Sequence, residues 1–408
     1  MEKFRNLGII EPILKSIQEQ KFVEPSEIQE KSIPLILAGK DVIAEAATGS
    51  GKTLAFAAGV IRDTEKTGRI QSLILTPTRE LAEQVAGSIQ RFSKHKHLEI
   101  IAIYGGLSIN PQIEKLRTAD VVIGTPGRIL DHLERRTISF SNVRLLVLDE
   151  ADRMLDMGFK DDVEKIIRNC PRNRQTLLFS ATISHDIAIL AKRYMNNPIL
   201  VSAKNYVDPS KLTQFYYDVP SEMKFSLLVH LLKSEKSGMA MVFCNTKHNT
   251  DFVAKNLNYN GVNALAIHGG HSQEKRSNTM DLFNTQKANI LVCTDVAARG
   301  LDIPGVTHVY NYDIPKCSKE YIHRIGRTAR AGKEGKAVSI VSRRDYENFN
   351  SVLEDSSLHI KAERLPEFPK VRVTLFEDSR RNFRRPFNRN FRHGQGNRSS
   401  YGGGRRRY

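Results

Sequence analysis

The segment AATGSGKT, residues 46–53, combines small residues with a lysine and a threonine at a spacing that suits phosphate binding. It follows the apolar run DVIAEA and opens the helical stretch LAFAAGVI. Backbone amides of such a loop cradle phosphates, Lys52 would reach the β- and γ-phosphates, and the Thr53 hydroxyl would ligate Mg²⁺. A glycine-rich turn without a ligand is the alternative, and the strand–loop–helix context favours a phosphate loop. The residues assigned to it are Thr48, Gly49, Ser50, Gly51, Lys52 and Thr53.

A second segment, LLVLDEADRML at residues 145–155, ends an apolar run on two adjacent carboxylates. Two such groups at the end of a buried strand repel each other unless a cation lies beside them. In phosphate-loop enzymes a second strand supplies an acidic group to magnesium, so Asp149 is the candidate magnesium ligand. Neighbouring strand residues point to opposite faces, which leaves Glu150 as the candidate that orients the attacking water. A solvated turn is the alternative. The expected cation is the magnesium–nucleotide pair.

Short apolar runs alternate with helical patterns along most of the chain, which predicts an α/β fold with mostly parallel sheets covered by helices on both faces. Crossovers of one hand bring the carboxyl ends of parallel strands to one edge, where open α/β sheets bind ligands. In many of these runs the apolar stretch gives way to Thr, Pro, Gly, Asp or Glu. The expected strand runs are DVIAEA (41–46), SLILTPT (72–78), IIAIYGG (100–106), DVVIGTP (120–126), LLVLDE (145–150), TLLFSAT (176–182), MAMVFCNT (239–246), ALAIHGG (264–270), ANILVCTD (288–295), THVYNYD (307–313) and KAVSIVS (336–342).

The two halves of the chain share this plan, so we expect two domains of similar fold. KNYVDPSK, a polar stretch with a proline, is the expected joint. Beyond about residue 379 the chain has no apolar set that could form a core, and we expect it to be disordered. The predicted boundaries are 1–203 for the first domain, 204–211 for the linker, 212–368 for the second domain and 369–408 for a basic tail.

The charge of the chain is strongly positive and unevenly placed. The net charge is +17, and residues 379–408 hold ten arginines and no acid or lysine, which leaves +7 for the first 378 residues. A basic excess of this kind indicates a polyanionic partner, nucleic acid before membrane. Solubility alone is the alternative, although arginine without lysine is an unusual means to it.

Cysteine usage and the absence of long apolar runs bear on location. The four cysteines are Cys170, Cys244, Cys293 and Cys317, without CxxC spacing or a nearby histidine cluster. We therefore expect a reducing compartment and no cysteine metal site. The start MEKFRNLGII does not resemble a signal peptide, and no uncharged apolar run approaches the 18 or so residues that span a bilayer. A soluble, cytoplasmic protein is expected, with the nucleus as a second location where the organism has one.

Asp149-Glu150-Ala151-Asp152 resembles the signature of the DEAD-box ATP-dependent RNA helicases of superfamily 2. The match extends over nearly all of residues 1–345, with the motifs in the family's order. This resemblance implies two tandem RecA-like domains, RNA as the partner, and ATP with Mg²⁺ as cofactors. In KFVEPSEIQ it implies that Phe22 stacks on adenine and that Gln29 hydrogen-bonds the edge of the base.

Further motifs of the same family divide between coupling and RNA contact. SAT resembles the link between the ATP site and domain closure, in which Ser180 and Thr182 are expected to contact Asp152. PTRELA, a glycine pair, TPGR, QEKR and the start of TDVAARGLD resemble RNA-gripping segments. One departure is Gly270, where an Asp is common in the family. The residues that the resemblance assigns to the RNA backbone are Pro77, Thr78, Arg79, Gly105, Gly106, Thr125, Pro126, Gly127, Arg128, Arg276 and Thr294.

HRIGRTAR, residues 323–330, resembles the segment that supplies arginine fingers. Arg327 and Arg330 would reach the triphosphate from the opposite domain, and such a finger is worth about 10³–10⁵ in rate. His323 is assigned to the same implied catalytic set, and Asp302 to the ribose of ATP. A solvated basic face is the alternative, which is reasonable for Arg330 alone and poor for the whole run.

The separation of these groups between two domains predicts that hydrolysis requires domain closure. RNA bound across both domains would favour the closed form and stimulate the ATPase, and by linkage ATP would tighten RNA binding. Contacts to the RNA backbone imply little sequence readout. We expect a monomer that separates RNA duplexes locally and non-processively or remodels RNA–protein complexes. The alternatives are an RNA clamp, a passive RNA chaperone and, less in keeping with the motifs, a processive DNA translocase.

The basic tail mixes arginines with aromatic residues. Stacking rings and guanidinium groups suit single-stranded RNA without sequence choice, and Arg384, Phe387 and Arg392 represent this composition. The alternatives are a solubilising tail or an address that a transport receptor reads.

Overall fold

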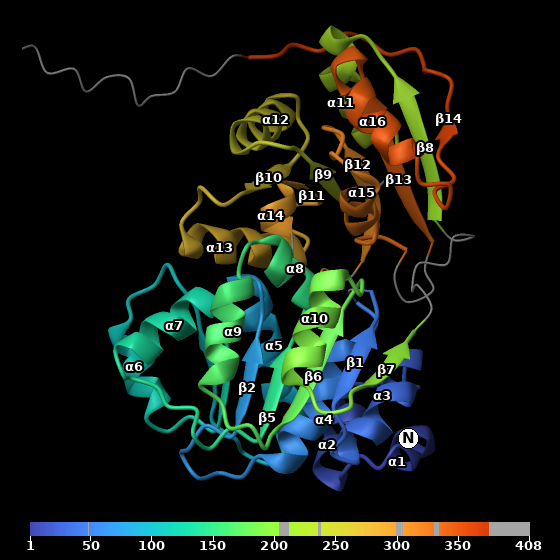
Figure 1. Ribbon diagram of the computed structural model, residues 1–408. Coiled ribbons are helices and arrows are strands. Elements are labelled where there is room, and N and C mark those ends of the chain that lie inside the picture. Colours follow the sequence, from blue (N-terminus) through green and yellow to red (C-terminus); the bar gives the residue numbers. More distant parts are fainter. Residues whose placement is uncertain are drawn as a thin grey trace, which may run out of the picture. The chain divides into compact units, whose positions relative to one another are not determined.

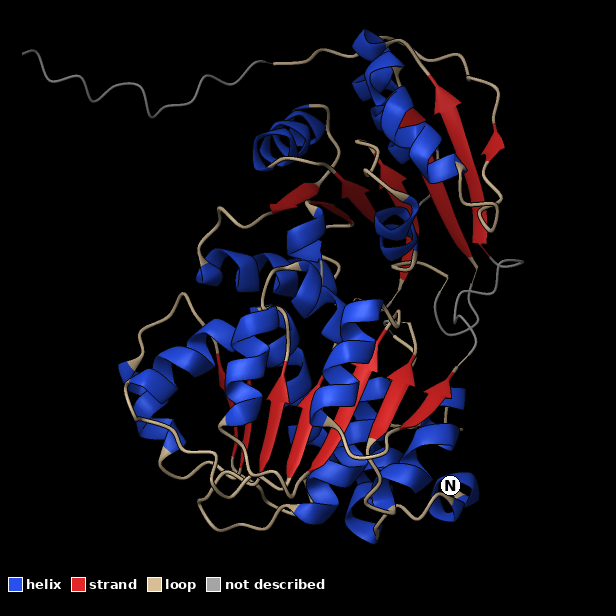
Figure 2. Ribbon diagram, in the orientation of Figure 1, coloured by secondary structure: helices blue, strands red, loops and turns tan. Residues whose placement is uncertain are grey.

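The computed structural model describes residues 1–47, 49–203, 212–235, 238–298, 303, 305–329 and 334–374. Residues Met1–Val373 form one compact unit, and this unit contains two seven-stranded sheets (Figures 1 and 2). Every strand pairing in both sheets is parallel. The predicted fold class of two parallel α/β sheets is confirmed. The predicted linker and the tail from residue 375 onward lie outside the described residues.

The first sheet has the strand order β3-β4-β2-β5-β6-β1-β7. Its strands are β1 (Val42–Glu45), β2 (Ser72–Leu75), β3 (Ile100–Ile103), β4 (Val121–Gly124), β5 (Leu145–Leu148), β6 (Gln175–Ser180) and β7 (Ile199–Ser202). In this order β6 lies between β1 and β5, with Glu45 opposite Ser180 and Leu148 opposite Leu178. The carboxyl ends of β1, β5 and β6 therefore share one edge, which is the edge that the sequence predicted to be functional.

Helices cover both faces of the first sheet, and the alternation of side chains along each strand explains why both faces are apolar. Val42 faces a core that includes Phe56, whereas Ile43 faces a second core that includes Ile166. Burial of each such side chain contributes about 1.5–3 kcal/mol. The helices are α1 (Glu2–Asn6), α2 (Glu11–Glu19), α3 (Glu27–Leu37), α4 (Lys52–Asp63), α5 (Arg79–Phe92), α6 (Asn110–Leu116), α7 (Pro126–Glu134), α8 (Ala151–Asp156), α9 (Lys160–Arg168) and α10 (His185–Tyr194).

The second sheet repeats this plan with the order β10-β11-β9-β12-β13-β8-β14. Its strands are β8 (Leu212–Asp218), β9 (Met239–Phe243), β10 (Ala264–Ile267), β11 (Ile290–Cys293), β12 (Val306–Asn311), β13 (Gly335–Val341) and β14 (Lys361–Ala362). Its helices are α11 (Lys224–Ser234), α12 (Lys247–Tyr259), α13 (Gln273–Asn284), α14 (Asp295–Ala298), α15 (Ser318–Ile325) and α16 (Tyr346–Leu353). The strands β7, β8 and β14 are additions to those predicted, and each pairs at or next to a sheet edge.

A partly buried carboxylate ties α11 to the second sheet. Glu235, directly after α11, accepts a hydrogen bond from Tyr310 at 3.0 Å and lies 3.2 Å from His308 of the same strand. Lys336 of β13 pairs with its other oxygen. Burial raises the pKa of Glu235, but the bonds from His308, Lys336 and Tyr310 outweigh this and lower it to about 2. The carboxylate is therefore charged across the physiological range and holds the helix to two strands.

Three of the four cysteines lie in the interior of the described chain. Cys244 and Cys293 are fully buried, as is typical of small core residues, and Cys170 is also buried. Among the helices that the structure describes, none is both long enough and apolar enough to cross a membrane.

Candidate functional site

The phosphate loop joins β1 to α4, and an N-terminal helix is attached to it. Gly51 has a φ of +92°, and a Cβ at this position would lie 2.4 Å from Gln29 Nε2, so only glycine fits. Gln29 is buried and donates from Nε2 to the Gly51 carbonyl at 2.9 Å. Ser26 donates to the Ser50 carbonyl at 2.7 Å. The element predicted to read adenine is therefore in direct contact with the loop predicted to bind the phosphates.

Phe22, predicted to stack on adenine, has an available ring. Its side chain is 40% exposed, and its ring centroid lies 6.0 Å from that of Phe92 at the end of α5. An aromatic ring with a free face can accept a flat base. Its role in binding adenine stays a prediction.

Lys52 and the two acidic residues after β5 lie together at the shared edge. Lys52 is the first residue of α4, is 7% exposed and donates to the Ala46 carbonyl at 3.1 Å. Asp149 is 3% exposed, and burial raises its pKa to about 6, while nearby Lys52 lowers it and Glu150 raises it further. The strand order thus brings together groups that are distant in the sequence. The lysine and the carboxylates form one charged cluster.

The orientation of Asp149 and Glu150 differs from the prediction. β5 ends at Leu148, so neither carboxylate is a strand residue, and the expectation of two opposite strand faces is wrong. Glu150 instead has a φ of +50°, a left-handed conformation that turns the chain into α8. Its carboxylate Oε2 lies 3.1 Å from Arg153 Nη1, and both side chains are almost fully buried. Arg153 is therefore a cation beside Glu150, and it was not among the predicted site residues.

The predicted partner of the SAT segment is confirmed as a contact. Asp152 Oδ2 accepts hydrogen bonds from the backbone N–H and the hydroxyl of Thr182, each at 3.2 Å. The Ser180 hydroxyl accepts from the Asp152 backbone N–H at 3.3 Å. Since Ser180 ends β6, this pair connects α8 to the strand between β1 and β5. The role of this contact in coupling hydrolysis to closure stays a prediction.

Segments predicted to grip RNA in the first domain also converge. The Arg79 guanidinium lies over Gly106, where φ is +87° and a Cβ would lie 2.0 Å from Arg79 Nη1. Arg128 donates to the Leu107 carbonyl at 3.0 Å, which ties TPGR to the glycine pair. Thr78 caps α5 by accepting from the Leu81 N–H. The other residues that the prediction placed here are Pro77 before this cap, Gly105 beside Arg79, and Thr125, Pro126 and Gly127 at the start of α7.

In the second domain the predicted RNA residue Arg276 lies on α13. Its Nη2 lies 2.9 Å from Glu80 Oε1, and Gln273 donates to the same oxygen at 3.3 Å. Glu80 neighbours Arg79 in sequence, so residues predicted to bind RNA in both halves approach each other in this unit. Thr294, at the end of β11, is buried.

The loop that contains Gly270 is ordered by a histidine–aspartate cluster. His268 Nε2 lies 3.0 Å from Asp251 on α12, and His271 Nε2 lies 3.5 Å from the same carboxylate. The three ligand atoms are close enough for a metal ion. However, His268 Nδ1 accepts from the Gly270 N–H at 3.1 Å, which leaves the ring proton on Nε2, and Lys275 Nζ lies 3.0 Å from His271. Asp251 and these bonds thus hold the two rings together, while His271 Nδ1 is buried without a hydrogen-bond partner among the described residues.

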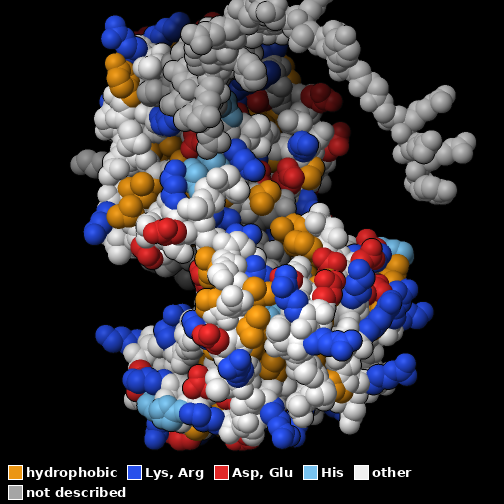
Figure 3. Space-filling view, turned by 90° about the vertical axis from the view of Figure 1, so that its left-hand side faces the viewer, with side chains coloured by type: hydrophobic (Ala, Val, Ile, Leu, Met, Phe, Trp, Pro, Cys, Tyr) orange, Lys and Arg blue, Asp and Glu red, His pale blue; other side chains and the backbone are white. Residues whose placement is uncertain are grey.

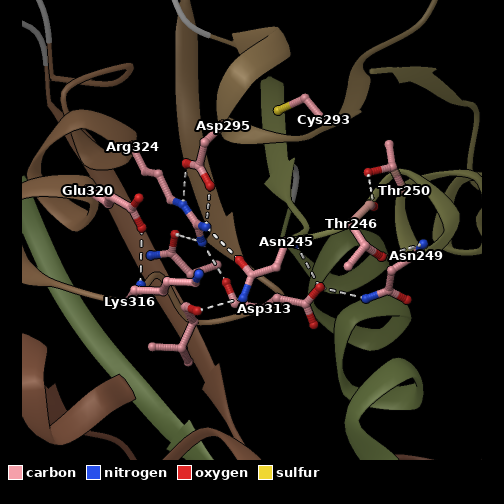
Figure 4. Close-up of polar contacts among 12 residues, drawn as sticks. Asn245, Thr246, Asn249, Thr250, Cys293, Asp295, Asp313, Lys316, Glu320 and Arg324 are labelled. Atoms are coloured by element: carbon pink, nitrogen blue, oxygen red, sulfur yellow. Dashed lines mark hydrogen bonds and ion pairs between the residues drawn. The ribbon is translucent and has the colours of Figure 1, made fainter. Parts of the chain in front are cut away.

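A buried arginine bonds to residues that follow the carboxyl ends of β9, β11 and β12 in the second sheet (Figure 4). Arg324 of α15 donates to both oxygens of Asp295 at 2.7 and 2.6 Å, to Asn245 Oδ1 at 2.8 Å and to the Asp313 carbonyl at 2.5 Å. Its side chain is 1% exposed. Arg324 was not among the predicted site residues, because a buried arginine looks the same in the sequence as a surface arginine within a basic run. The signal that could have found it is Asp295, an acid two residues after the buried strand β11.

His323 and Arg327 lie close to Arg324 in the sequence. Both line a small cavity that is also bordered by Arg153, Phe243 and Asp295. Burial, followed by the charge of Arg153, lowers the pKa of His323 to about 4, so its imidazole is neutral at pH 7. The predicted site residues that lie outside the described part of the chain are Thr48, Asp302, Arg330, Arg384, Phe387 and Arg392.

The face of the molecule that Figure 3 draws, which is the left-hand side of Figure 1, carries both signs of charge. Figure 3 shows Lys and Arg side chains interspersed with Asp and Glu over the described residues of the face drawn. On this face, nucleic-acid contact is therefore expected from particular residues and not from a broad basic surface.

Comparison with known proteins identifies relatives over most of the chain. The family DEAD/DEAH box helicase matches residues 26–190, and the helicase conserved C-terminal domain matches residues 223–332. The ATP-dependent RNA helicase CshA of Listeria monocytogenes is 47% identical over 348 residues, which are 85% of this chain and 67% of that protein. CshA of Geobacillus kaustophilus is 46% identical over 85% of this chain and 74% of its own length. The chain spans about two thirds of the length of most such relatives.

Solved structures agree with this assignment. A DEAD box protein of Methanococcus jannaschii is 44% identical, with 89% of this chain and 99% of that chain covered and a TM-score of 0.55. Dbp5 of Saccharomyces cerevisiae, solved with RNA and ADP BeF3, is 32% identical, with 89% and 96% covered and a TM-score of 0.81. The two sheets described above are thus tandem RecA-like domains.

Proposed function

Because this chain belongs to the DEAD/DEAH box helicase family, we propose that it is an ATP-dependent RNA helicase that hydrolyses ATP when RNA draws its two domains together. The observation that carries the proposal is the shared strand edge, where Lys52 and Asp149 lie together and Asp152 is bonded to Thr182. Such an edge is where open α/β sheets bind nucleotides. The relatives named CshA and the RNA-bound Dbp5 structure support RNA as the partner of this chain.

Each residue of the site has a part in the proposed hydrolysis. The amides after β1 and the ammonium of Lys52 bind the phosphates at the start of α4. Glu150 orients a water whose oxygen bonds to the γ-phosphorus while the bond to the bridging oxygen breaks, which releases ADP and phosphate. Arg327 stabilises the charge on the transferring group as an arginine finger, a part that Arg330 would share. Phe22 and Gln29 hold the adenine.

The residues at the loop also fit magnesium. Thr53 and Asp149 offer the oxygen ligands that Mg²⁺ prefers, and they would hold it. Ser50 Oγ at the same loop is buried without a hydrogen-bond partner among the described residues, which suits a site that receives a further polar group. When bound, the ion would supply neutralisation of phosphate charge. Burial keeps the pKa of Asp149 near 6, so the carboxylate is mostly charged at pH 7.

RNA is proposed to lie on the segments that converge around Arg79, Arg128 and Arg276. Their contacts would be to the sugar–phosphate backbone, which gives little sequence preference. We propose domain boundaries of 1–203 and 212–368, a monomeric state, a cytoplasmic location, and added RNA affinity from the arginines of residues 369–408. The second candidate is an RNA clamp with the same ATPase. Such a clamp needs only that the two domains close on RNA, without separation of a duplex.

The test is the ATPase rate with and without single-stranded RNA, together with strand separation of a short duplex. Lys52→Ala should lose RNA-stimulated hydrolysis by about 10²-fold or more, because the ammonium that binds the phosphates is gone. Lys66→Ala, an exposed lysine on a surface loop, is the matched control. A rate indifferent to RNA would refute the proposal. Stimulated hydrolysis without strand separation would favour the clamp, and strand separation that survives Lys52→Ala would favour a passive chaperone.

A further inference from the structure

Arg153 is a buried charge to which the helicase motifs give no part. It lies in the first turn of α8 and is 2% exposed. Its Nη1 lies 3.1 Å from Glu150 Oε2, and the two side chains are 3% and 4% exposed. Removing one member of a buried ion pair leaves the other without compensation, so these two groups depend on each other.

The three carboxylates in this segment have different partners. Asp149, Glu150 and Asp152 fall within one turn of chain, and like charges so close would otherwise spread apart or take up protons. Lys52 acts on Asp149 and Arg153 pairs with Glu150, whereas Asp152 is held by the neutral donors of Thr182. Arg153, which pairs with Glu150, is thus a different cation from Lys52, which acts on Asp149.

The position of Glu150 is also set by its backbone. Its φ of +50° is a strained conformation that a non-glycine residue adopts only when the surroundings require it. The backbone N–H of Arg153 donates to the Glu150 carbonyl at 3.0 Å while its guanidinium holds the carboxylate. Both ends of Glu150 are thus fixed by the residue three positions later.

Arg153 also lies close to residues of the second domain. It lines one cavity with His323, Arg324 and Arg327. Three arginines around one small cavity require anions, and Asp295 holds Arg324 while Glu150 holds Arg153. Arg153 is therefore placed where a shift of α15 would bear on the orientation of Glu150.

We infer that Arg153 is a positioning residue for hydrolysis, which fixes the Glu150 carboxylate toward the attacking water through their ion pair. The inference rests on the proposed ATPase function. A carboxylate that orients a water must be held within about 0.5 Å of its productive place, and misplacement by about 1 Å costs roughly 10²-fold in rate. Arg153 acts through Glu150 and touches neither substrate nor ion in this role.

The experiment compares Arg153→Met, which keeps length and loses charge, with Arg153→Lys, which keeps charge and loses the planar fork. Steady-state ATPase is measured on the full chain with saturating single-stranded RNA, with Arg193→Met as a control for loss of an exposed ion-paired arginine. We expect kcat to fall about 10- to 100-fold in Arg153→Met and about threefold in Arg153→Lys. KM for ATP should stay within about twofold, as should RNA affinity with a non-hydrolysable ATP analogue, because binding does not use the water.

The outcomes are separable. The order wild type, then Arg153→Lys, then Arg153→Met in kcat at constant KM supports the inference. Should Arg153→Met fail to fold, a lowered kcat in Arg153→Lys at constant KM still decides in its favour. A wild-type kcat in Arg153→Lys, an equal loss in both variants, or a change in KM alone overturns it. If Lys52→Ala also keeps the wild-type rate, the ATPase proposal itself has failed; if only the Arg153 variants do, this inference alone has failed.

Discussion

Replacement of Arg324 by methionine should destabilise the second domain more than any surface change of the same kind. The guanidinium satisfies Asp295, Asn245 Oδ1 and the Asp313 carbonyl, and its side chain is 1% exposed. Breaking a buried pair by removing one partner costs about 3–5 kcal/mol. With a urea m-value of about 2 kcal/mol per molar, this corresponds to a lower unfolding midpoint by roughly 1.5–2.5 M.

The assay is urea unfolding followed by circular dichroism, since the chain has no tryptophan to report by fluorescence. Arg168→Met is the control, because this arginine pairs with Glu164 at 2.9 Å but its side chain is 62% exposed, and such pairs contribute at most about 1 kcal/mol. Arg324→Met combined with Asp295→Asn should recover part of the loss by removing the unpaired charge. Equal midpoints for the Arg324 and Arg168 variants would refute the reasoning.

Three further predictions concern coupling, RNA binding and pH. Asp152→Asn loses the charged acceptor of two hydrogen bonds from the SAT segment, so RNA stimulation of the ATPase should drop about tenfold while ATP binding stays near wild type, measured with a fluorescent nucleotide. Gly106→Ala must displace the guanidinium above it and should weaken single-stranded RNA binding by roughly tenfold in a filter assay, whereas Gly87→Ala, which has room for a Cβ, should not. Glu235 has a folded pKa of about 2, below its ordinary 4.5, so its stabilisation is complete above pH 4.5 and is lost as the pH falls toward 2. The melting temperature of wild type should therefore exceed that of Glu235→Gln by a constant amount from pH 8 to 5 and converge with it below; a gap that persists at pH 3 would contradict the assignment.

Much of the fold could be predicted, as could the meeting of Lys52 and Asp149 at one sheet edge, because parallel α/β architecture places the loops that follow such strands together. The runs before Lys52 and Asp149 are continuous and apolar, so their carboxyl ends had to meet at a sheet edge. Of the strands that were missed, β8 and β14 lack such a run, and β7 has only the short apolar run 199–201. In β8 exposed and buried residues are mixed, as expected next to a sheet edge, and β14 has two exposed residues.

The parts of the site that the sequence did not reveal are charges that are paired in the interior. Arg153 and Arg324 look like ordinary polar residues in their segments, and only the fold shows that Glu150 and Asp295 are their partners. The orientation of Glu150 could not be predicted from the sequence either. A residue between a strand and a helix can adopt a left-handed φ, and no glycine marks the position in this sequence. Pairing and backbone strain are properties of the assembled structure.

The strand order of the first sheet has a consequence for synthesis of the chain on the ribosome. β1 carries the phosphate loop, but both of its neighbours, β6 and β7, are encoded more than a hundred residues later. The nascent polypeptide therefore exposes its loop long before the two strands that flank β1 exist. The loop can take the shape described above only after Ser202 has left the exit tunnel, so stalled chains that end before this point should fail to retain nucleotide.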